Sequence, residues 1–224
     1  MEYIDIFDEN NNPIGEKKEK QQAHENGNFH RTAHVWIIND KNELLLQKRS
    51  ASKKSHPNCW DISGAGHIRA GESVIDGAIR ELKEELGVET EEKDLQYITT
   101  IKSTKNPKNM EFQYVYLLKC NKNVEQYIFK DGEVSDVKYI FYKDLEKMVK
   151  EKFEGILIHE EEYKYLFKYI THKNLTIRKC SSSDIDSIYN IQNIIIDNFK
   201  EEEKGYFLPF KKETYLRIVN DPIN

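Results

Sequence analysis

The chain has 224 residues, 38% hydrophobic and 33% charged, with 13 Tyr and 10 Phe, a composition typical of a soluble globular protein with an aromatic-rich interior. Its net charge of −5 argues against a nucleic-acid-binding surface, because such surfaces depend on clustered Lys and Arg. No apolar run reaches the length of a membrane span and the N-terminus has no signal pattern, so we expect a cytoplasmic protein without membrane contact.

The first part of the chain predicts strands joined by turns. Tyr3–Phe7 is predicted to be a short strand, followed by turn-forming residues and by the charged run Glu16–Lys20, which we expect to be solvated. His34–Ile38 and Glu43–Gln47 are predicted to form a hairpin with the four-residue turn Asn39–Asn42 between them.

A helix is predicted from Val74 to Leu86, with signals at both ends. Ser73 and Asp76 have the spacing of a capping box, and Gly87 stands where a left-handed residue often ends a helix. At about 100° per residue, one arc of this helix is apolar and should face the core. The residues on that arc are Ile75, Ala78, Ile79, Leu82 and Leu86.

Three carboxylates, those of Glu81, Glu84 and Glu85, lie on the neighbouring arc. Like charges at spacings of three and four residues repel, so this face is unfavourable unless a cation is present. Gly77 lies one turn above on the same arc, where its lack of a side chain is expected to leave room for an ion and a ligand. On an ordinary helix, such a charged face is more often a solvated surface.

The spacing of residues in and before the helix argues against a merely solvated charged surface. Gly66 is followed after five residues by Glu72 and after seven more by Arg80-Glu81-Leu82-x-Glu84-Glu85-x-Gly87-Val88. This order matches the Nudix box at every specified position, and a chance match at a given start is on the order of one in a billion. The chain therefore resembles the Nudix hydrolases. The resemblance implies hydrolysis of a diphosphate bond in a nucleoside diphosphate linked to another moiety, or in a related small organic diphosphate.

The resemblance also implies a cofactor and roles for the box residues. The cofactor is Mg²⁺, with Mn²⁺ as a substitute, and Mg²⁺ binds well where a few carboxylates meet substrate phosphates. Several such ions can activate water and neutralise charge on the phosphoryl oxygens. Arg80 is implied to orient the carboxylates, and Glu84 or Glu85 is a candidate for orienting the attacking water. The implied metal ligands are Glu81, Glu84 and Glu85, assisted by Glu72 and the Gly66 carbonyl.

The rest of the first domain adds strands and a late helix. Asp144 is predicted to cap a helix through Val149. Mixed strands with these two helices fit the α/β/α sandwich with a mixed sheet that the resemblance implies, and we assign residues 1–172 to this Nudix domain. The predicted strands after the box are Leu95–Thr100, Phe112–Leu118 and Glu133–Phe141.

The flanks of the box resemble the isopentenyl-diphosphate isomerases and the hydrolases related to them. This second resemblance rests on residues 29–36, residues 53–57, Trp60 and the pair Gly66-His67. In the isomerases a catalytic Cys precedes the Gly-His pair, whereas this chain has Ala65, so isomerase chemistry lacks its thiol. The cysteines present are scattered without CxxC spacing and are expected to be reduced thiols. They are Cys59, Cys120 and Cys180.

Several residues outside the helix are further candidates. Glu111 and Glu133 are candidate general bases, with surface glutamates as the alternative. Arg49 is predicted to hold a substrate phosphate, with a solvated Arg as the alternative, and His67 is predicted to contact substrate. In the isomerases histidines bind a second metal, and the residues near those positions here are either a metal site or ordinary loop histidines. They are His24, His30 and His67.

Residues 173–224 form a separate appendage in this interpretation. Leu175–Lys179 and Ser183–Ile191 resemble the first strand and helix of the GCN5-related N-acetyltransferases. The glycine-rich turn that holds the coenzyme A pyrophosphate in that family is missing from the remaining residues, so acetyl transfer is not predicted. The segment is either a truncated piece of a longer fusion or a helical appendage that packs on the first domain or on a neighbour.

Three functions compete on the sequence. The leading one is a Mg²⁺-dependent diphosphohydrolase, and the second is the isomerase, disfavoured by Ala65. The third is a non-catalytic nucleotide-binding module, which usually lacks one of the box carboxylates that this chain retains. We expect a small-molecule diphosphate as the partner, with a homodimer as a candidate assembly. Residues 102–110 and 121–131 are expected to be loops that recognise the group attached to the diphosphate.

Overall fold

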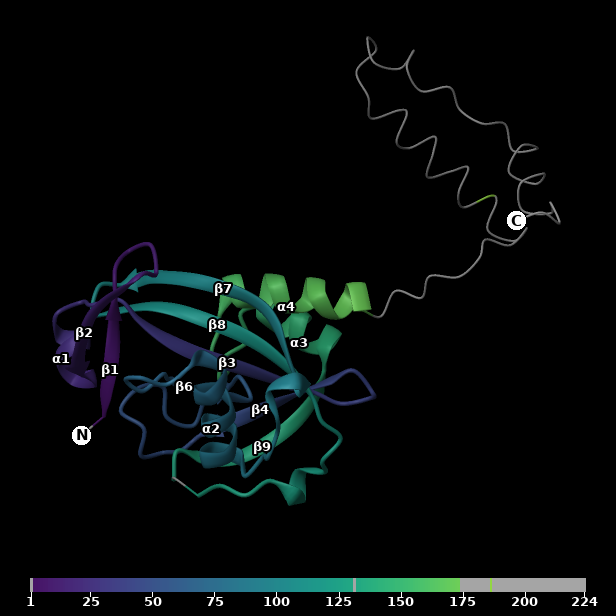
Figure 1. The fold of residues 1–224 in the computed structure, drawn as a ribbon. Coiled ribbons are helices and arrows are strands. Elements are labelled where there is room, and N and C mark those ends of the chain that lie inside the picture. The colour runs from purple at the N-terminus through teal and green to yellow at the C-terminus, as the bar shows by residue number, and fades with distance from the viewer. Residues whose placement is uncertain (1, 131, 174–185, 187–224) are drawn as a thin grey trace, which may run out of the picture. The chain divides into compact units, whose positions relative to one another are not determined.

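A mixed seven-stranded sheet is the centre of the fold in a computed structural model, which describes residues 2–130, 132–173 and 186 (Figure 1). The strands are β1 (Tyr3–Phe7), β2 (Pro13–Glu19), β3 (His30–Ile38), β4 (Glu43–Arg49), β5 (Trp60–Asp61), β6 (Gly64–His67), β7 (Leu95–Asn106), β8 (Asn109–Lys119) and β9 (Val134–Phe141). The sheet has the order β5-β4-β3-β8-β7, with β6 paired to β3 and β9 paired to β4, while β1 and β2 form a separate hairpin. β3 and β8 are parallel and the other pairs antiparallel, which confirms the predicted mixed sheet.

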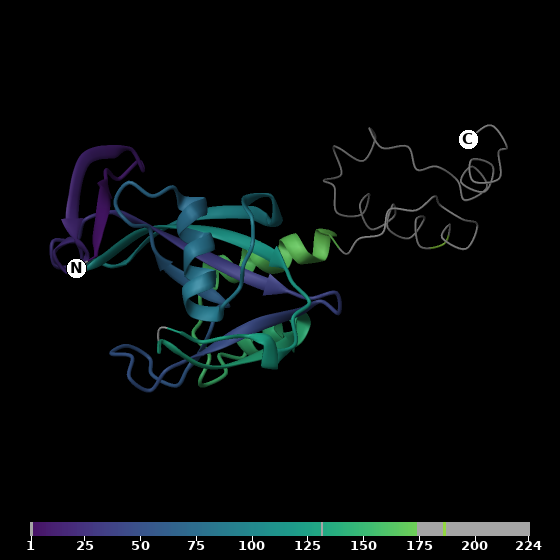
Figure 2. The same ribbon diagram turned by 60° about the horizontal axis from the view of Figure 1, so that its bottom comes forward.

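Helices cover both faces of this sheet. Those that the structure describes are α1 (Lys20–Glu25), α2 (Val74–Leu86), α3 (Tyr142–Lys150) and α4 (Glu160–Lys173). α2 packs on one face and α3 and α4 on the other (Figures 1 and 2), which confirms the predicted sandwich. α2 has the predicted ends, since the Asp76 N–H donates to Ser73 Oγ at 3.1 Å and Gly87 has a φ of +63°.

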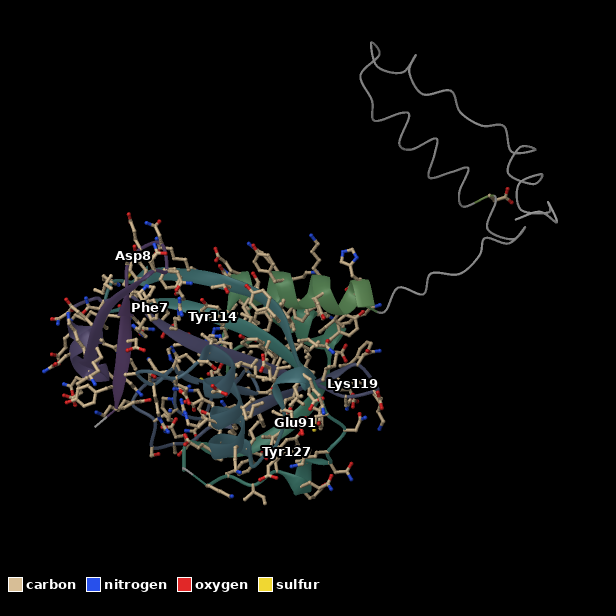
Figure 3. The ribbon with its side chains drawn as sticks, viewed as in Figure 1. Phe7, Asp8, Glu91, Tyr114, Lys119 and Tyr127 are labelled. Carbon is tan, nitrogen blue, oxygen red and sulfur yellow. The ribbon has the colours of Figure 1, made fainter. Side chains whose placement is uncertain are left out.

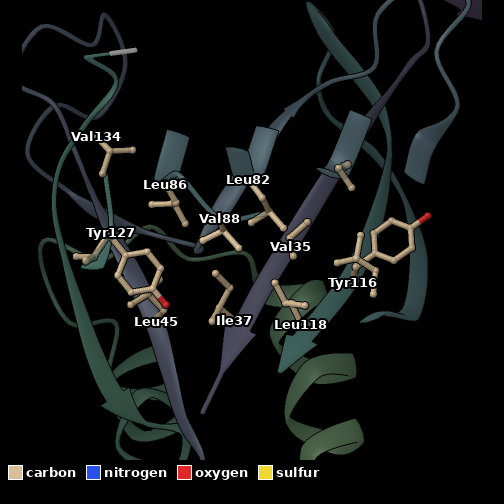
Figure 4. Packing of buried hydrophobic residues seen from close by; sticks show 14 of the residues in the cluster. Val35, Ile37, Leu45, Leu82, Leu86, Val88, Tyr116, Leu118, Tyr127 and Val134 are labelled. Atoms are coloured by element: carbon tan, nitrogen blue, oxygen red, sulfur yellow. The ribbon is translucent and has the colours of Figure 1, made fainter. Parts of the chain in front are cut away.

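The core between the sheet and α2 is built from alternate residues of β3, because successive side chains of a strand point to opposite faces. Val35 and Ile37 point toward α2, where they join Leu82 and Leu86 in one apolar cluster (Figure 4). All four side chains are buried. Burying an aliphatic side chain of this size contributes about 1.5–3 kcal/mol, so this layer fixes α2 and its acidic face against the sheet.

The opposite face of β3 packs against α4. Trp36 is fully buried there, with its ring 5.4 Å from the ring of Tyr163 on α4. Leu166 and Phe167 belong to the same cluster and follow Tyr163 at helical spacing. α4 was not among the predicted elements, although this spacing is visible in the sequence.

Nearer the start of β3, this same face becomes polar. His30, Thr32 and His34 occupy alternate positions and are all buried. β8 runs parallel beside them and contributes Glu111 and Gln113 at the matching positions. The apolar half of the face lies under α4, whereas most of the polar half lines a cleft.

The β1–β2 hairpin is held at the start of β3 by Arg31, whose side chain points to the face opposite His30 and Thr32. The Arg31 guanidinium lies 3.8 Å from the ring centroid of Phe7 and 5.6 Å from that of Tyr114. Figure 3 labels Phe7 and Tyr114. Arg31 Nε also donates to Asn11 at 2.8 Å, and the Asn11 amide donates to Tyr114 Oη at 2.8 Å. These contacts tie the hairpin, and α1 after it, to β3 and β8.

Glu16–Lys20 is exposed or partly exposed, as predicted, and most of it belongs to β2, an unpredicted strand that pairs with β1. Two local predictions were wrong. Lys102–Met110 is not a loop, since β7 and β8 continue until two residues separate them. Asp144 lies in the first turn of α3, whose N-cap is Phe141. For both β2 and Lys102–Met110, pairing with a neighbouring strand outweighs local propensity.

The predicted appendage lies outside the described residues, except for residues 173 and 186. The division at residue 172 and the acetyltransferase resemblance therefore stay predictions, while the chain up to Lys173 forms one compact unit. Cys59 and Cys120 are free thiols. Within the described part of the chain, no helix combines the length and apolar character that crossing a membrane requires.

Candidate active site

The acidic face of α2 is organised around Arg80. Its Nε and Nη2 donate to the two oxygens of Glu72 at 2.9 and 3.0 Å, and its Nη1 donates to Glu81 at 2.6 Å and Glu84 at 3.1 Å. Nη2 also donates to the His67 carbonyl at 2.9 Å, which ties the helix to β6. Burial opposes protonation, but Glu72 and Glu81 together raise the pKa of Arg80. Arg80 is therefore a fixed cation that orients three carboxylates.

Glu81 lies directly against the backbone of Gly66. A Cβ at position 66 would come within 2.0 Å of the Glu81 carboxyl carbon, so the close approach of helix and strand requires glycine. Burial raises the pKa of Glu81, and the opposing effect of Arg80 does not cancel this. A partly buried carboxylate of this kind is stabilised by a nearby cation.

Glu85 and Glu84 differ in their exposure. Glu85 is 4% exposed and accepts hydrogen bonds from the Ala65 N–H at 3.2 Å and from Gln47 Nε2 at 3.4 Å. The Glu84 side chain is 42% exposed and pairs with Arg69 at 3.1 Å as well as with Arg80. Glu85 is thus fixed by the sheet, whereas Glu84 remains open to water.

The predicted room above the carboxylates is filled. A Cβ at Gly77 would lie 2.5 Å from Ile68 Cδ1 and 3.1 Å from Glu72 Oε2. The glycine therefore accommodates these two side chains, which corrects the expectation that it leaves space for an ion and a ligand.

A cleft of about 1340 Å³ opens beside β6. Ala65, Gly66 and His67 form part of its wall, so the acidic face of α2 reaches the cleft through Gly66. Other lining residues come from the segment 49–56 and from residues 157–159, just before α4. The charged lining of the cleft is mixed. The basic residues are Lys20, Arg49, Lys53, Lys54 and Lys108, and the acidic ones are Glu2, Glu19, Glu25, Asp61, Glu111 and Glu133.

Three histidines and a glutamate converge in this cleft. His24 Nε2 lies 3.1 Å from His67 Nε2, and Glu111 Oε1 lies 3.7 Å from His30 Nε2 and 3.9 Å from His67 Nε2. His30 is fully buried, and its Nε2 has no hydrogen-bond partner among the described residues. Burial lowers the pKa of both His24 and His67. Neutral imidazoles with free lone pairs are the form that binds a metal ion.

A second group of histidines lies elsewhere in the cleft, and no sequence pattern predicted it. His34 Nδ1 lies 2.8 Å from Glu162 Oε2, and His159 Nε2 lies 2.8 Å from Asp61 Oδ1. His34 follows His30 by four residues, a distance of roughly 13 Å along the strand. The missed signal is the helical spacing of α4, which places Glu162 beside Trp36 and His34.

Arg49 and Glu133, two predicted site residues, line the cleft with contacts to the segment that follows β4. Arg49 Nη1 donates to Asp61 at 3.1 Å, and its Nη2 donates to the Ser55 carbonyl at 3.0 Å. Glu133 forms an ion pair with Lys53. Their predicted roles in substrate binding and base catalysis stay predictions.

Comparisons with known proteins identify the family. The family model of the NUDIX domain matches residues 28–167. An uncharacterized Nudix hydrolase of Clostridium acetobutylicum is 35% identical over 184 residues, which cover 77% of this chain and 88% of the relative. The chain belongs to the Nudix family.

Two further matches of this Nudix protein are informative. Isopentenyl-diphosphate Delta-isomerase 2 of Photorhabdus laumondii is 32% identical over 140 residues, covering 62% of this chain and 77% of the relative. The crystal structure of DR0079 from Deinococcus radiodurans has a TM-score of 0.59 at 21% identity, covers 75% of this chain and 98% of that one, and shows the shared fold. The chain is a Nudix hydrolase, an enzyme of a family that cleaves diphosphate bonds and generally uses divalent metal ions.

The box of this Nudix hydrolase fits a hard divalent cation. Glu81, Glu84 and Glu85 offer carboxylate oxygens, and Gly66 offers a backbone carbonyl, which are the ligand types that Mg²⁺ prefers. The raised pKa of Glu81 shows that its carboxylate is not fully compensated by Arg80. A cation beside Gly66 would supply the missing charge.

Proposed function

We propose that this Nudix hydrolase is a Mg²⁺-dependent diphosphohydrolase that also accepts Mn²⁺. Its substrate is a nucleoside diphosphate linked to another group or a related small organic diphosphate. The observation that carries the proposal is the placement of three box carboxylates beside β6 at the wall of the cleft. Glu81 lies against Gly66, Glu84 shares Arg80 with Glu81, and Glu85 accepts from the Ala65 N–H.

The roles of the box residues follow from their contacts. Glu81, Glu84 and Glu85 would hold the metal, which when bound neutralises charge on the phosphoryl oxygens and acidifies a water molecule. Arg80 orients Glu81 and Glu84, and Glu72 holds Arg80 through both of its oxygens. Because Glu84 is more open to water than Glu85, it is the better placed of the two to orient the attacking water.

We propose a second metal position at His24, His30, His67 and Glu111. The resemblance to the isomerases implies such a site, and the nitrogen atoms of the three histidines lie close enough to share one ion. Imidazole ligands with one carboxylate suit a first-row transition metal such as Zn²⁺ better than Mg²⁺. The buried Nε2 of His30 supports this proposal, because it makes no hydrogen bond to a described residue and has the Glu111 carboxylate 3.7 Å away.

The two competing functions are less well supported. Ala65 lines the cleft at the position of the isomerase thiol, and neither Cys59 nor Cys120 lines it. Proton transfer to carbon therefore lacks the thiol that the isomerases use. A non-catalytic binding module would not need the full set of box carboxylates that this chain retains.

The test is metal-dependent hydrolysis of a panel of nucleoside diphosphates, diphospho-sugars, dinucleotides and isopentenyl diphosphate. Glu84→Gln and Glu85→Gln each remove one charge with little change in shape, and we expect kcat to fall roughly 100- to 1000-fold. Glu89→Gln is the matched control, because Glu89 lies just beyond α2 with its side chain 80% exposed. Thermal unfolding of each variant establishes that the fold is retained.

The outcomes separate the candidate functions. Hydrolysis that requires Mg²⁺ or Mn²⁺, is lost in both box variants and is kept by the control supports the proposal. An intact panel in the presence of either metal, with a nucleotide still bound, supports the binding module. Conversion of isopentenyl diphosphate to its isomer supports the isomerase.

A further inference from the structure

Two histidines in the cleft are each held by a buried carboxylate. His34 on β3 bonds through Nδ1 to Glu162 on α4, and His159, just before α4, bonds through Nε2 to Asp61 on β5. The two rings face each other edge-on, with centroids 5.8 Å apart and planes at 77°. Both rings line the cleft.

The carboxylates that hold these rings are themselves fixed. Glu162 is 1% exposed, and its second oxygen accepts a 2.6 Å hydrogen bond from Trp36 Nε1. Asp61 accepts hydrogen bonds from the Ile62 N–H at 2.9 Å and from Arg49 at 3.1 Å. Glu162 does not line the cleft, whereas Asp61 lines it beside His34 and His159. Each carboxylate already accepts hydrogen bonds from protein groups, so the imidazoles are the parts of these pairs that can donate to a ligand.

These carboxylates favour the charged form of the imidazoles. Burial lowers the pKa of His34, but Glu162 outweighs it, with help from Glu111 and Asp61, and raises the pKa to about 9. For His159, burial is likewise outweighed by Asp61 and Glu162, while His34 opposes, and the pKa is raised. Two cationic rings this close repel each other, and an anion between them would relieve the repulsion.

A metal ion fits these histidines less well than an anion does. Each imidazole lies at 2.8 Å from a carboxylate oxygen, which is hydrogen-bond length, so the nitrogen that faces the carboxylate holds a proton. His30 differs, since its buried Nε2 has no partner among the described residues. The remaining nitrogen of His34 has no hydrogen bond to a described residue and is a donor when the ring is charged.

The position of His34 places the His34–His159 pair in the same cleft as the strand that leads into the Nudix box. In the pairing of β3 with β6, His34 lies directly opposite Ala65, the residue before Gly66. Opposed residues of antiparallel strands are about 5 Å apart at Cα, and their side chains lie on the same face. Ala65 and Gly66 line the same cleft as His34 and His159, although α2 and its carboxylates lie on the other face of the sheet. A group bound at His34 therefore shares the cleft with a diphosphate that reaches the box beside Gly66.

We propose that His34 and His159 form an oxyanion subsite that binds a phosphate or carboxylate of the group attached to the diphosphate. The subsite selects substrates whose attached group carries its own negative charge. This inference rests on the proposed diphosphohydrolase function and specifies the class of substrate.

The first test is binding without any metal. In the full chain with a chelator present, imidazole nitrogen signals are followed by NMR during titration with inorganic phosphate, and His34→Gln and His159→Gln assign them. We expect both rings to shift together, and the shift of His159 to weaken roughly 10-fold or more in His34→Gln, as for loss of a charge-assisted hydrogen bond. His172→Gln is the matched control, since His172 is an exposed histidine at the far end of α4. Rings that do not respond to phosphate overturn the proposal.

The second test uses hydrolysis of paired substrates with and without a phosphate or carboxylate on the attached group. In His159→Gln, and in Glu162→Gln where the fold permits, we expect KM for the charged substrates to rise roughly 10- to 100-fold. We expect kcat for the uncharged substrate to stay within about twofold, because these residues do not touch the box carboxylates. Equal losses on both members of a pair overturn the proposal, and the phosphate and carboxylate pairs show which oxyanion is selected. If the wild-type chain hydrolyses no substrate, the proposed function fails. The phosphate titration still shows whether His34 and His159 bind an oxyanion.

Discussion

Two groups of histidines share one strand and one cleft but have opposite charge preferences. His30 on β3 stands with His24 and His67, where burial lowers the pKa of the latter two. His34, four residues later, is at least as enclosed as His67, yet Glu162 raises its pKa to about 9. Burial lowers the pKa in both groups. Glu162 is hydrogen-bonded to His34 at 2.8 Å, whereas Glu111 lies 3.9 Å from His67, whose pKa Lys20 and the neighbouring histidines lower further.

This difference shows how neighbours assign chemistry to one residue type. A histidine whose nitrogen is buried without a partner can give its lone pair to a metal ion, as at His30. A histidine paired with a buried carboxylate is a fixed cation and a hydrogen-bond donor, as at His34. One cleft can therefore hold a metal and an anion on the same face of a sheet.

The largest predicted effect is on transition-metal binding. We expect His30→Ala to weaken Zn²⁺ or Co²⁺ binding at least about 100-fold, because losing a ligand should exceed the 10- to 100-fold loss seen for an outer-shell partner. His159→Ala should leave this affinity unchanged. Co²⁺ absorption during titration of the full chain measures both variants. Equal losses of metal affinity in the two variants would show that the His30 group and the His34–His159 pair do not differ in metal binding.

A comparable effect is expected on stability as a function of pH. Because the folded-state pKa of His34, about 9, is above the ordinary value of about 6.5, its contribution is present below about pH 6.5 and is lost as pH rises through about 9. The change is on the order of 3 kcal/mol. In Glu162→Gln the ring loses the carboxylate that holds its proton. The difference in unfolding free energy between wild type and this variant should shrink over that window.

Urea unfolding at several pH values measures this difference. His159→Gln is the comparison variant, since it removes the neighbouring ring and keeps the His34–Glu162 pair. A difference between wild type and Glu162→Gln that stays constant from about pH 6.5 to pH 9 would show that His34 is neutral in the folded protein.

The smallest predicted effect concerns the bond that fixes Glu162. Trp36→Phe keeps an aromatic ring in the core but removes the 2.6 Å hydrogen bond from Nε1 to Glu162. We expect a loss of about 1.5–3 kcal/mol in unfolding free energy, as for a hydrogen bond to a charged group. Metal binding at the His30 group should not change. A Trp36→Phe protein as stable as wild type would show that Glu162 finds another donor.

Much of the fold was predictable because its signals are local. Ser73 and Gly87 determine the ends of α2 through bonds within a few residues, and the apolar arc between them gives its buried face. The spacing of the box residues likewise identifies the acidic face, because that spacing is a property of the sequence itself. β2 was missed because its charged residues are exposed on a hairpin, where pairing with β1 outweighs composition.

The histidine groups were predictable only in part. The resemblance to the isomerases drew attention to His24, His30 and His67, although the 3.1 Å approach of His24 to His67 depends on how α1 docks on the sheet. The helical spacing of α4 was the only sequence signal near the His34–Glu162 pair, and it could not indicate the pairing, because the two residues are 128 positions apart. Whether a histidine gains a carboxylate partner depends on which distant element packs over its strand.

For this protein, short-range chemistry in the chain was sufficient to predict the box helix, its carboxylate face and the family. Helix caps and helical periodicity act over a few residues, so the amino-acid sequence alone is enough to predict them. The packing of α4 over β3 set the burial and partners of His34, and the docking of α1 assembled the His30 group. Protonation depends on desolvation and on charges within a few ångströms, which the folded chain establishes.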